Sequence, residues 1–269
     1  MLTFLFWNLS QKPLAERLTR MVRHYEVDVV VLAECAIPTE EMLLSLKREQ
    51  VEFQATYSQC DKIAIYTRFP AEFIETRVDA HRWTIRHLHL TGRLDILLVA
   101  AHFPSMLRWK PSSQPYECVV LAEEIRRVEQ EMACERTVLV GDLNMNPFES
   151  GVISAKGLHA VMARDLALRK ERKVQGRQYR FFYNPMWNRL GDETDGTPGT
   201  YFYQRAEHDV LFWNMFDQVL LRPELLPHFK TEELKILSRD GKVSLLSAKG
   251  IPDKIKASDH LPILFKLHL

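Results

Sequence analysis

The 269-residue sequence predicts an α/β fold, and three features of the chain lead to that class. Apolar strand-like runs flank a helix-like segment near the N-terminus, short strand-like runs fill the next part, and a long amphipathic segment then leads into an apolar strand. With 46% hydrophobic residues, a chain of this length can bury a sizeable core. We therefore expect a single domain over residues 1–269, with a long loop insertion at about 151–214.

The N-terminal elements follow from the spacing of the apolar residues. They are, in order, a strand at 3–9, a helix behind Pro13, a strand at 27–33 and a helix at 39–48. The two strands end on polar residues, Asn8 and Glu34.

The pattern then changes to short apolar runs separated by turn residues such as Thr91-Gly92. This change predicts a meander of antiparallel strands. The expected strands are 52–57, 62–66, 73–78, 83–90 and 95–101, and the last is followed by His102. Pro115 begins the longest expected helix, whose apolar stripe predicts packing against a sheet.

The stretch from Val138 to Phe148 is the centre of the prediction. Its apolar run is typical of a buried strand, and we expect that strand to end at Gly141 and the backbone to turn toward a site. Because side chains alternate along an extended chain, Asp142 and Asn144 can project to the same side. A carboxylate beside a carboxamide can bind a hard cation or position a water molecule. The alternative for these residues is an Asx turn.

The C-terminal part contains fewer regular elements. From Gly151 to Asn214 we expect long loops with short helices. Long loops in a compact domain are usually functional or disordered. Short strands follow at 218–221, directly after Asp217, and at 234–237. A final strand at 263–267 follows Asp259 and His260.

Composition restricts the class of protein. Lys and Arg total 36 against 35 for Asp and Glu, so an anionic partner must be held by a local patch. The four cysteines form no C-x-x-C pair, which disfavours a disulfide framework or a structural zinc site. We find neither a signal peptide nor an apolar run long enough to span a bilayer. The expectation is a cytoplasmic protein with no membrane association and no obligate protein partner.

Polar residues gather at the ends of the expected strands. They are Asn8, Glu34, His102, Asp142, Asn144, Asp217, Asp259 and His260. Strand ends are where ligands bind in layered α/β proteins. Carboxylate and amide oxygens suit Mg²⁺ or Ca²⁺, and histidines handle protons near neutral pH. The set is therefore typical of metal-assisted phosphoester hydrolysis, the alternative being a collection of caps and turns.

Six short motifs occur in order across nearly the whole chain. They are Phe6-Trp7-Asn8, Leu32-Ala33-Glu34, Ala101-His102-Phe103-Pro104-Ser105, Gly141-Asp142-Leu143-Asn144-Met145-Asn146-Pro147, Phe216-Asp217-Gln218-Val219 and Ser258-Asp259-His260-Leu261-Pro262-Ile263. Together they resemble the endonuclease/exonuclease/phosphatase superfamily, which has the deoxyribonuclease-I-like fold. The resemblance implies a four-layer α/β sandwich, in which two mixed β-sheets pack face to face with helices on the outside.

The resemblance also implies a metal site and a general base. Mg²⁺, or Mn²⁺ in its place, would be held mainly by Glu34, with Asn8 and Asp259 beside it. Asp142 would activate the attacking water, and Asn144 would orient that water or the phosphate.

The remaining roles fall on two histidines. By the same resemblance, His260 would contact the scissile phosphate, and Asp217 would hold its tautomer. His102 would bind the phosphate or protonate the leaving oxygen. The abasic-site endonucleases of the superfamily have Gln-Glu-Thr around the metal glutamate, whereas this chain has Ala33-Glu34-Cys35, and they have tyrosine in place of His102. These departures disfavour a DNA-repair role.

A basic stretch followed by many aromatic residues favours a nucleic-acid substrate, either DNA or RNA. The candidate contacts are Arg177, Arg180, Tyr183, Trp187 and Tyr201. The predicted function is a Mg²⁺-dependent phosphodiesterase, an endonuclease or exonuclease. One alternative is the same chemistry on a small phosphoester, such as a nucleotide, an inositol phosphate or a lipid headgroup. A binding module without catalysis is the other.

Overall fold

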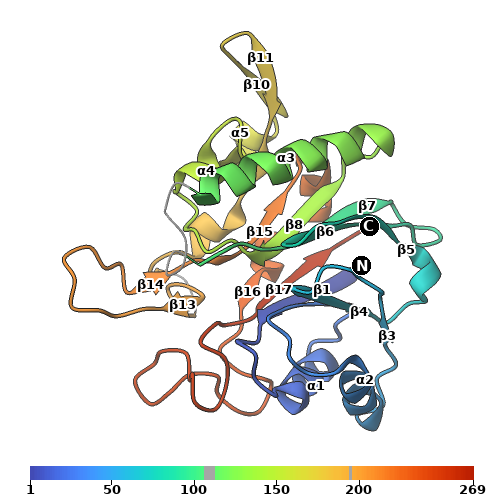
Figure 1. Cartoon of the computed structure of the whole chain (residues 1–269), viewed down its shortest axis with the longest axis vertical. Coiled ribbons are helices and arrows are strands. Elements are labelled where there is room, and N and C mark those ends of the chain that lie inside the picture. The colour runs from blue at the N-terminus through green and yellow to red at the C-terminus, as the bar shows by residue number, and fades with distance from the viewer. Residues whose placement is uncertain (106–112, 194–195) are drawn as a thin grey trace.

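Two mixed β-sheets packed face to face form the centre of the molecule (Figure 1). The computed structural model describes residues 1–105, 113–193 and 196–269. The first sheet contains, in spatial order, β16 (Lys235–Ile236), β17 (Ile263–Leu267), β1 (Leu2–Asn8), β2 (Val29–Ala33), β4 (Ile63–Thr67) and β3 (Gln54–Ala55). The second sheet contains β5 (Ile74–Asp79), β6 (Trp83–Leu88), β7 (Ile96–His102), β8 (Thr137–Asp142), β15 (Asp217–Leu221), β12 (Phe182–Tyr183) and β9 (Ala160–Val161).

Helices cover the outer face of each sheet. Helices α1 (Ala15–His24) and α2 (Thr39–Arg48) bury their apolar sides against the first sheet, and α3 (Ser113–Glu131) buries its stripe against the second. In Figure 1 these helices lie on opposite sides of the paired sheets. The four-layer α/β sandwich is therefore confirmed.

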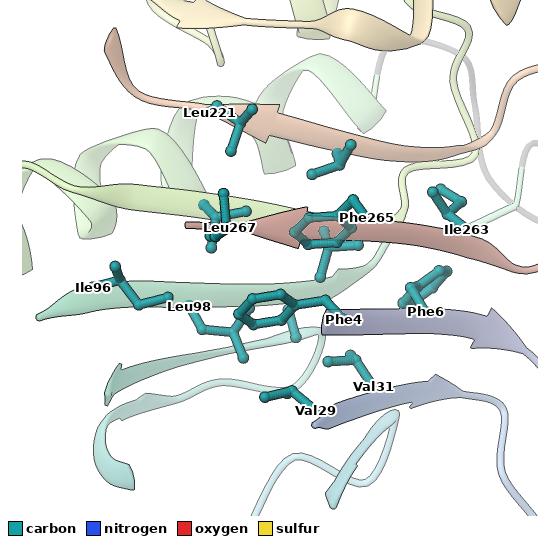
Figure 2. Close-up of a cluster of buried hydrophobic side chains, with 14 of the residues drawn as sticks. Phe4, Phe6, Val29, Val31, Ile96, Leu98, Leu221, Ile263, Phe265 and Leu267 are labelled. Carbon is teal, nitrogen blue, oxygen red and sulfur yellow. The ribbon is translucent and has the colours of Figure 1, made fainter. Parts of the chain in front are cut away.

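The core between the sheets explains why the strands are apolar along their whole length. Phe4 and Phe6 of β1 face the second sheet, whereas Leu5 and Trp7 face the helices. Both faces of each central strand are buried, so alternation of apolar and polar residues is absent. Figure 2 shows the inter-sheet side chains, among which the rings of Phe4 and Phe265 stack with their centroids 4.9 Å apart.

Strand register brings the polar strand ends to one edge. In the parallel pair β1–β2, Asn8 lies opposite Ala33, so Glu34 follows directly beside it. In the second sheet, Asp142 lies between His102 on one side and Asp217 on the other. The convergence expected for carboxyl ends of parallel strands is present in both sheets.

The predicted end of β8 at Gly141 is wrong, because β8 continues to Asp142. Both neighbouring strands pair with β8 as far as Asp142, which holds Gly141 inside the sheet. A Cβ atom at Gly141 would lie 2.0 Å from the carbonyl oxygen of Ala101. Gly141 therefore allows a close backbone approach rather than a turn.

The expected meander is divided between the two sheets. Strands β5, β6 and β7 form an antiparallel meander in the second sheet, but β4 pairs with β2 in the first. The chain crosses between sheets through the short 3₁₀ helix η1 (Ala71–Phe73) after Pro70. Fixed φ at proline suits this change of direction.

The segment from 151 to 214 contains short strands in addition to the expected short helices. Its elements are α4 (Ser150–Ile153), β9, α5 (Arg164–Ala167), β10 (Glu171–Val174), β11 (Arg177–Arg180), β12, η2 (Pro185–Arg189), β13 (Tyr201–Phe202) and β14 (Trp213–Asn214). The hairpins β10–β11 and β13–β14 lie outside the two large sheets. Two further 3₁₀ helices are η3 (Pro223–His228) and η4 (Thr231–Glu233). Within the described ranges, every helix is too short or too polar to cross a membrane.

The packing of α2 predicts different stabilities for two substitutions of the same kind. Leu46 is 1% exposed and Leu44 is 57% exposed, although both lie in α2. We expect Leu46→Ala to lower the free energy of unfolding by about 2–5 kcal/mol, because it leaves a cavity under the helix. The matched control Leu44→Ala should change it by less than about 0.5 kcal/mol. Urea unfolding measures both, and equal effects would contradict the assigned orientation of α2.

Candidate active site

A pocket of about 630 Å³ opens at the edge where the polar strand ends converge. Seven of the sequence-predicted residues line it: Asn8, Glu34, Asp142, Asn144, Tyr201, Asp259 and His260. His102 and Asp217 lie directly behind this lining and contact it through Glu34, Asp142 and His260. The structure therefore brings together all eight polar residues that follow the strands.

Asp142 is at the centre of the contacts and is 1% exposed. Its Oδ2 atom accepts a hydrogen bond of 2.9 Å from the side-chain amide of Asn8. The Nε2 atoms of His102 and His260 each lie 3.8 Å from the same oxygen. Two imidazoles from different strand ends thus point at one carboxylate oxygen.

An Asx turn fixes the backbone beyond Asp142. The backbone N–H of Asn144 donates to Oδ1 of Asp142 over 2.9 Å, and Asn144 has a left-handed φ of 48°. The Asn144 side-chain amide donates to the carbonyl of Phe103. The Asx turn and the site are therefore not competing interpretations, because the turn is what aims Asn144 into the pocket.

Glu34 forms the neighbouring wall and also has a left-handed φ, 46°. Its Oε1 lies 3.3 Å from Nε2 of His102, and its side chain is 31% exposed, so the carboxylate remains accessible from the pocket. The hydrogen bond with His102 has the largest effect on Glu34 and lowers its pKa, and the charges of His102 and His260 lower it further. Burial acts in the opposite direction but is outweighed. The carboxylate is therefore ionised at neutral pH.

His260 is held by Asp217 in a buried hydrogen bond of 2.8 Å between Nδ1 and Oδ2. Burial alone lowers the pKa of His260, but the charges of Asp217, Asp142 and Asp259 outweigh burial and raise this pKa to about 10. The Nδ1 contact fixes the ring so that Nε2 faces Asp142 and the pocket. His260 is accordingly a cation that can donate a hydrogen bond to an anionic ligand.

Tyr201 packs against this imidazolium. Its ring centroid lies 4.7 Å from that of His260 and 5.3 Å from that of Phe216. Burial, together with the charges of Asp259 and Asp142, raises the pKa of Tyr201 to about 12. The phenol is therefore neutral and acts as a rigid wall.

Two groups of residues could hold a metal ion. Asp142, Asp217 and His260 have ligand atoms within 4.8 Å of one another, but Asp217 and His260 are already joined by their hydrogen bond. Glu34 and Asp259 instead present carboxylates to the pocket itself. Oxygen donors without cysteine fit a hard divalent cation such as Mg²⁺ or Mn²⁺. The Asn8 amide oxygen accepts from the backbone of Ser10, so its nitrogen faces Asp142.

Four of the five predicted substrate contacts lie away from the pocket lining. Arg177 is exposed on the β10–β11 hairpin, which projects from the molecule apart from β13–β14 (Figure 1). The guanidinium of Arg180 pairs with Glu135 at 3.1 Å and Glu224 at 3.0 Å.

The other two candidates are aromatic residues that pack within the protein. Tyr183 is 2% exposed and belongs to the core between the sheets. The ring of Trp187 packs against that of Phe148, with centroids 6.1 Å apart. The structure brings only Tyr201 of this group to the site.

Sequence reasoning missed most of the wall formed by the β13–β14 hairpin. Tyr203, Arg205, Glu207 and Asp209 line the pocket from this hairpin. The guanidinium of Arg205 lies 5.4 Å from the ring centroid of Tyr203. The many aromatic residues of this segment indicate a binding surface, but only the hairpin geometry shows which rings reach the pocket.

Comparisons with known proteins agree with the fold and the motif order. A model of the endonuclease/exonuclease/phosphatase family matches residues 5–260. No curated protein sequence matches the chain significantly. Similar solved structures include an AP endonuclease from Archaeoglobus fulgidus, with 14% identity and a TM-score of 0.58, covering 100% of both chains.

Two further similar structures contain DNA. The 3′ phosphatase NExo from Neisseria, bound to a product DNA hairpin, has 11% identity and a TM-score of 0.60, covering 99% of both chains. TDP2 from D. rerio, complexed with a single-strand DNA product, has 17% identity and a TM-score of 0.57, covering 98% of this chain and 97% of that one. At these identities the likeness establishes the fold.

The contacts of His260 predict how it titrates in the metal-free protein. Its pKa of about 10 lies above the ordinary 6.5, so the stability contributed by the imidazolium is fully present below about pH 6.5 and is lost as the pH rises through about 10. Asp217→Asn should bring the pKa of His260 down toward or below 6.5, because the closest charge is removed. Histidine NMR titration measures this.

The control for this titration is Asp259→Asn, which removes a charge that affects His260 less than Asp217 does and should therefore lower the pKa of His260 less. A neutral His260 at pH 8 in the unmodified protein would refute the assignment.

Proposed function

The chain belongs to the endonuclease/exonuclease/phosphatase family, and from this premise we propose that it is a divalent-metal-dependent phosphodiesterase acting on nucleic acid. One observation carries the proposal: the His260 and His102 imidazoles meet at one oxygen of Asp142, beside the pocket that Glu34 lines. A proton acceptor, a cationic donor and an accessible carboxylate then surround the same space.

In the proposed reaction, Asp142 takes a proton from a water molecule whose oxygen forms a bond to phosphorus. The bond from phosphorus to the leaving oxygen breaks, and that oxygen takes up a proton. The products are a phosphomonoester and a free hydroxyl. Nε2 of His260 donates to a phosphoryl oxygen, and Asp217 keeps the ring in place from the other side. Asn144 orients the water or the phosphate, and His102 binds the phosphate or protonates the leaving oxygen.

Glu34 and Asp259 are the proposed holders of Mg²⁺ or Mn²⁺. Both line the pocket, and the lowered pKa of Glu34 keeps its carboxylate ionised. A bound divalent ion neutralises charge on the phosphoryl oxygens. Asn8 fits a positioning role better than a ligand role, because its amide nitrogen donates to Asp142 while its oxygen accepts from Ser10.

The β13–β14 hairpin supports nucleic acid as the substrate. Tyr203 and Arg205 lie close together on the pocket wall and offer an aromatic ring and a planar cation to an unpaired base. Two of the similar structures carry DNA products, one of them single-stranded. An unpaired strand entering beside Tyr203 would place a phosphate near His260.

A small phosphoester is the second candidate, favoured by the charge of the lining. Glu149, Glu207 and Asp209 line the pocket in addition to the carboxylates already described. Among the described lining residues, Arg205 is the only arginine or lysine. A polyanion is repelled by such a lining more strongly than a small substrate is.

Removing the proposed base or metal ligand should abolish hydrolysis. We expect Asp142→Asn and Glu34→Gln each to lower kcat at least about 100-fold on an oligonucleotide or a small phosphodiester with Mg²⁺. The matched controls Asp165→Asn and Glu41→Gln alter exposed helix residues and should retain full activity. Full activity in Asp142→Asn would disprove the role of Asp142 as the base. Activity in the presence of a chelator would disprove the dependence on a divalent metal ion.

Substitutions in the β13–β14 hairpin distinguish a nucleic-acid substrate from a small phosphoester. Tyr203→Ala and Arg205→Ala should each lower kcat/KM on single-stranded DNA or RNA about tenfold, because one stacking contact is lost. Neither should affect bis(p-nitrophenyl) phosphate, which is too small to span the pocket. Undetectable cleavage of single- and double-stranded DNA and RNA, alongside turnover of a small phosphoester, would reject nucleic acid as the substrate.

A further inference from the structure

A separate group of metal-ligand side chains lies at the other end of the second sheet, away from the pocket. His87 is near the end of β6, and His89 follows two residues later. Glu75 of β5 is the direct cross-strand partner of His87. His87 lies opposite Leu97 of β7, five residues before His102, which separates this group from the pocket by roughly 17 Å along the strand.

His87 is oriented by a carboxylate. Its Nε2 lies 3.2 Å from Oδ2 of Asp95, so the proton of the neutral ring belongs on Nε2, and Nδ1 carries a lone pair. His87 is 8% exposed, and Nδ1 is buried without a hydrogen-bond partner. Oε2 of Glu75 lies 3.9 Å from this nitrogen. In that tautomer, a buried lone pair faces a carboxylate across a gap too long for a hydrogen bond.

His89 is the candidate for a third donor, because its ring lies beside that of His87. Alternation along an extended chain puts residues two apart on one side, and the rings of His87 and His89 are 5.3 Å apart between centroids. A ring nitrogen of His89 would reach a shared ion only after rotation of its half-buried side chain. The second oxygen of Glu75 is held by Arg77 at 2.8 Å, which leaves Oε2 directed at His87.

We propose that His87, His89 and Glu75 bind a zinc ion, with Asp95 holding His87 in the required tautomer. Two imidazoles and one carboxylate are donors that favour zinc over magnesium, and three protein ligands leave one position for water. A carboxylate on the far nitrogen of a metal-binding histidine is a recurrent arrangement. Because β5 is the edge strand of the second sheet, the ion would fasten this edge independently of catalysis.

Calorimetric titration with Zn²⁺ in excess Mg²⁺ tests the proposal. All variants carry Glu34→Gln in addition, because this substitution weakens Zn²⁺ binding in the catalytic pocket and so reduces its share of the measured heat. We expect one binding event whose affinity falls at least about tenfold in Glu75→Gln, His89→Ala and Asp95→Asn. The matched control is His81→Ala, which alters a histidine whose side chain is 67% exposed and should bind zinc unchanged.

Co²⁺ gives a second readout. Bound at this site, it should show the intense visible absorption of a four-coordinate complex, and His89→Ala should abolish that band. In an otherwise unmodified chain, His89→Ala should keep full phosphodiesterase activity, so the outcome is separate from that of the proposed function. Absence of Zn²⁺ binding, or binding unchanged by His89→Ala and Glu75→Gln, would overturn the proposal.

Discussion

The hydrogen bond from Asn8 to Asp142 joins the ends of two strands that belong to different sheets, and the candidate active site depends on this junction. Two further contacts attach the loop that carries His260 to the same strand end. The indole of Trp7 donates to the His260 carbonyl, and the Ser258 hydroxyl donates to the Asn8 carbonyl. The apolar faces between the sheets set how the strands align, so the packing of the core determines where the polar groups meet.

Within the pocket, the ionisable groups divide into two sets with different electrostatics. Asp142, Asp217 and His260 are almost fully buried and stabilise one another, with an imidazolium between two carboxylates. Glu34 and Asp259 reach the pocket, where a cation can be exchanged with solvent. Buried charges are unfavourable unless they are paired, and a concentration of them is typical of functional sites, which supports the proposed site. Left-handed backbone at Glu34 and Asn144 points to the same conclusion.

Much of the site could be predicted from sequence, because an apolar run that stops at a polar residue marks a strand end, as at Asn8, Glu34 and Asp142. Parallel neighbours bring such ends to one edge within each sheet, whereas the meeting of the two edges depends on how the sheets pack. This approach failed for the predicted substrate contacts. Arg180 is neutralised by Glu135 and Glu224, and Tyr183 is buried, because tertiary partners far apart in sequence decide where those side chains go. The prediction of a strand end at Gly141 is wrong for a similar reason. The close approach of Gly141 to Ala101 exists only once β7 and β8 pair, so the sequence of β8 alone does not show it.

The division of the pocket into a hydrogen-bonded set and a cation-holding set is the central claim. Anomalous diffraction from crystals soaked in Mn²⁺ tests it most directly. The account predicts a peak in the catalytic pocket within coordination distance of Glu34 and Asp259, with Nδ1 of His260 still hydrogen-bonded to Asp217. A peak enclosed by Asp142, Asp217 and His260, with that hydrogen bond broken, would contradict it.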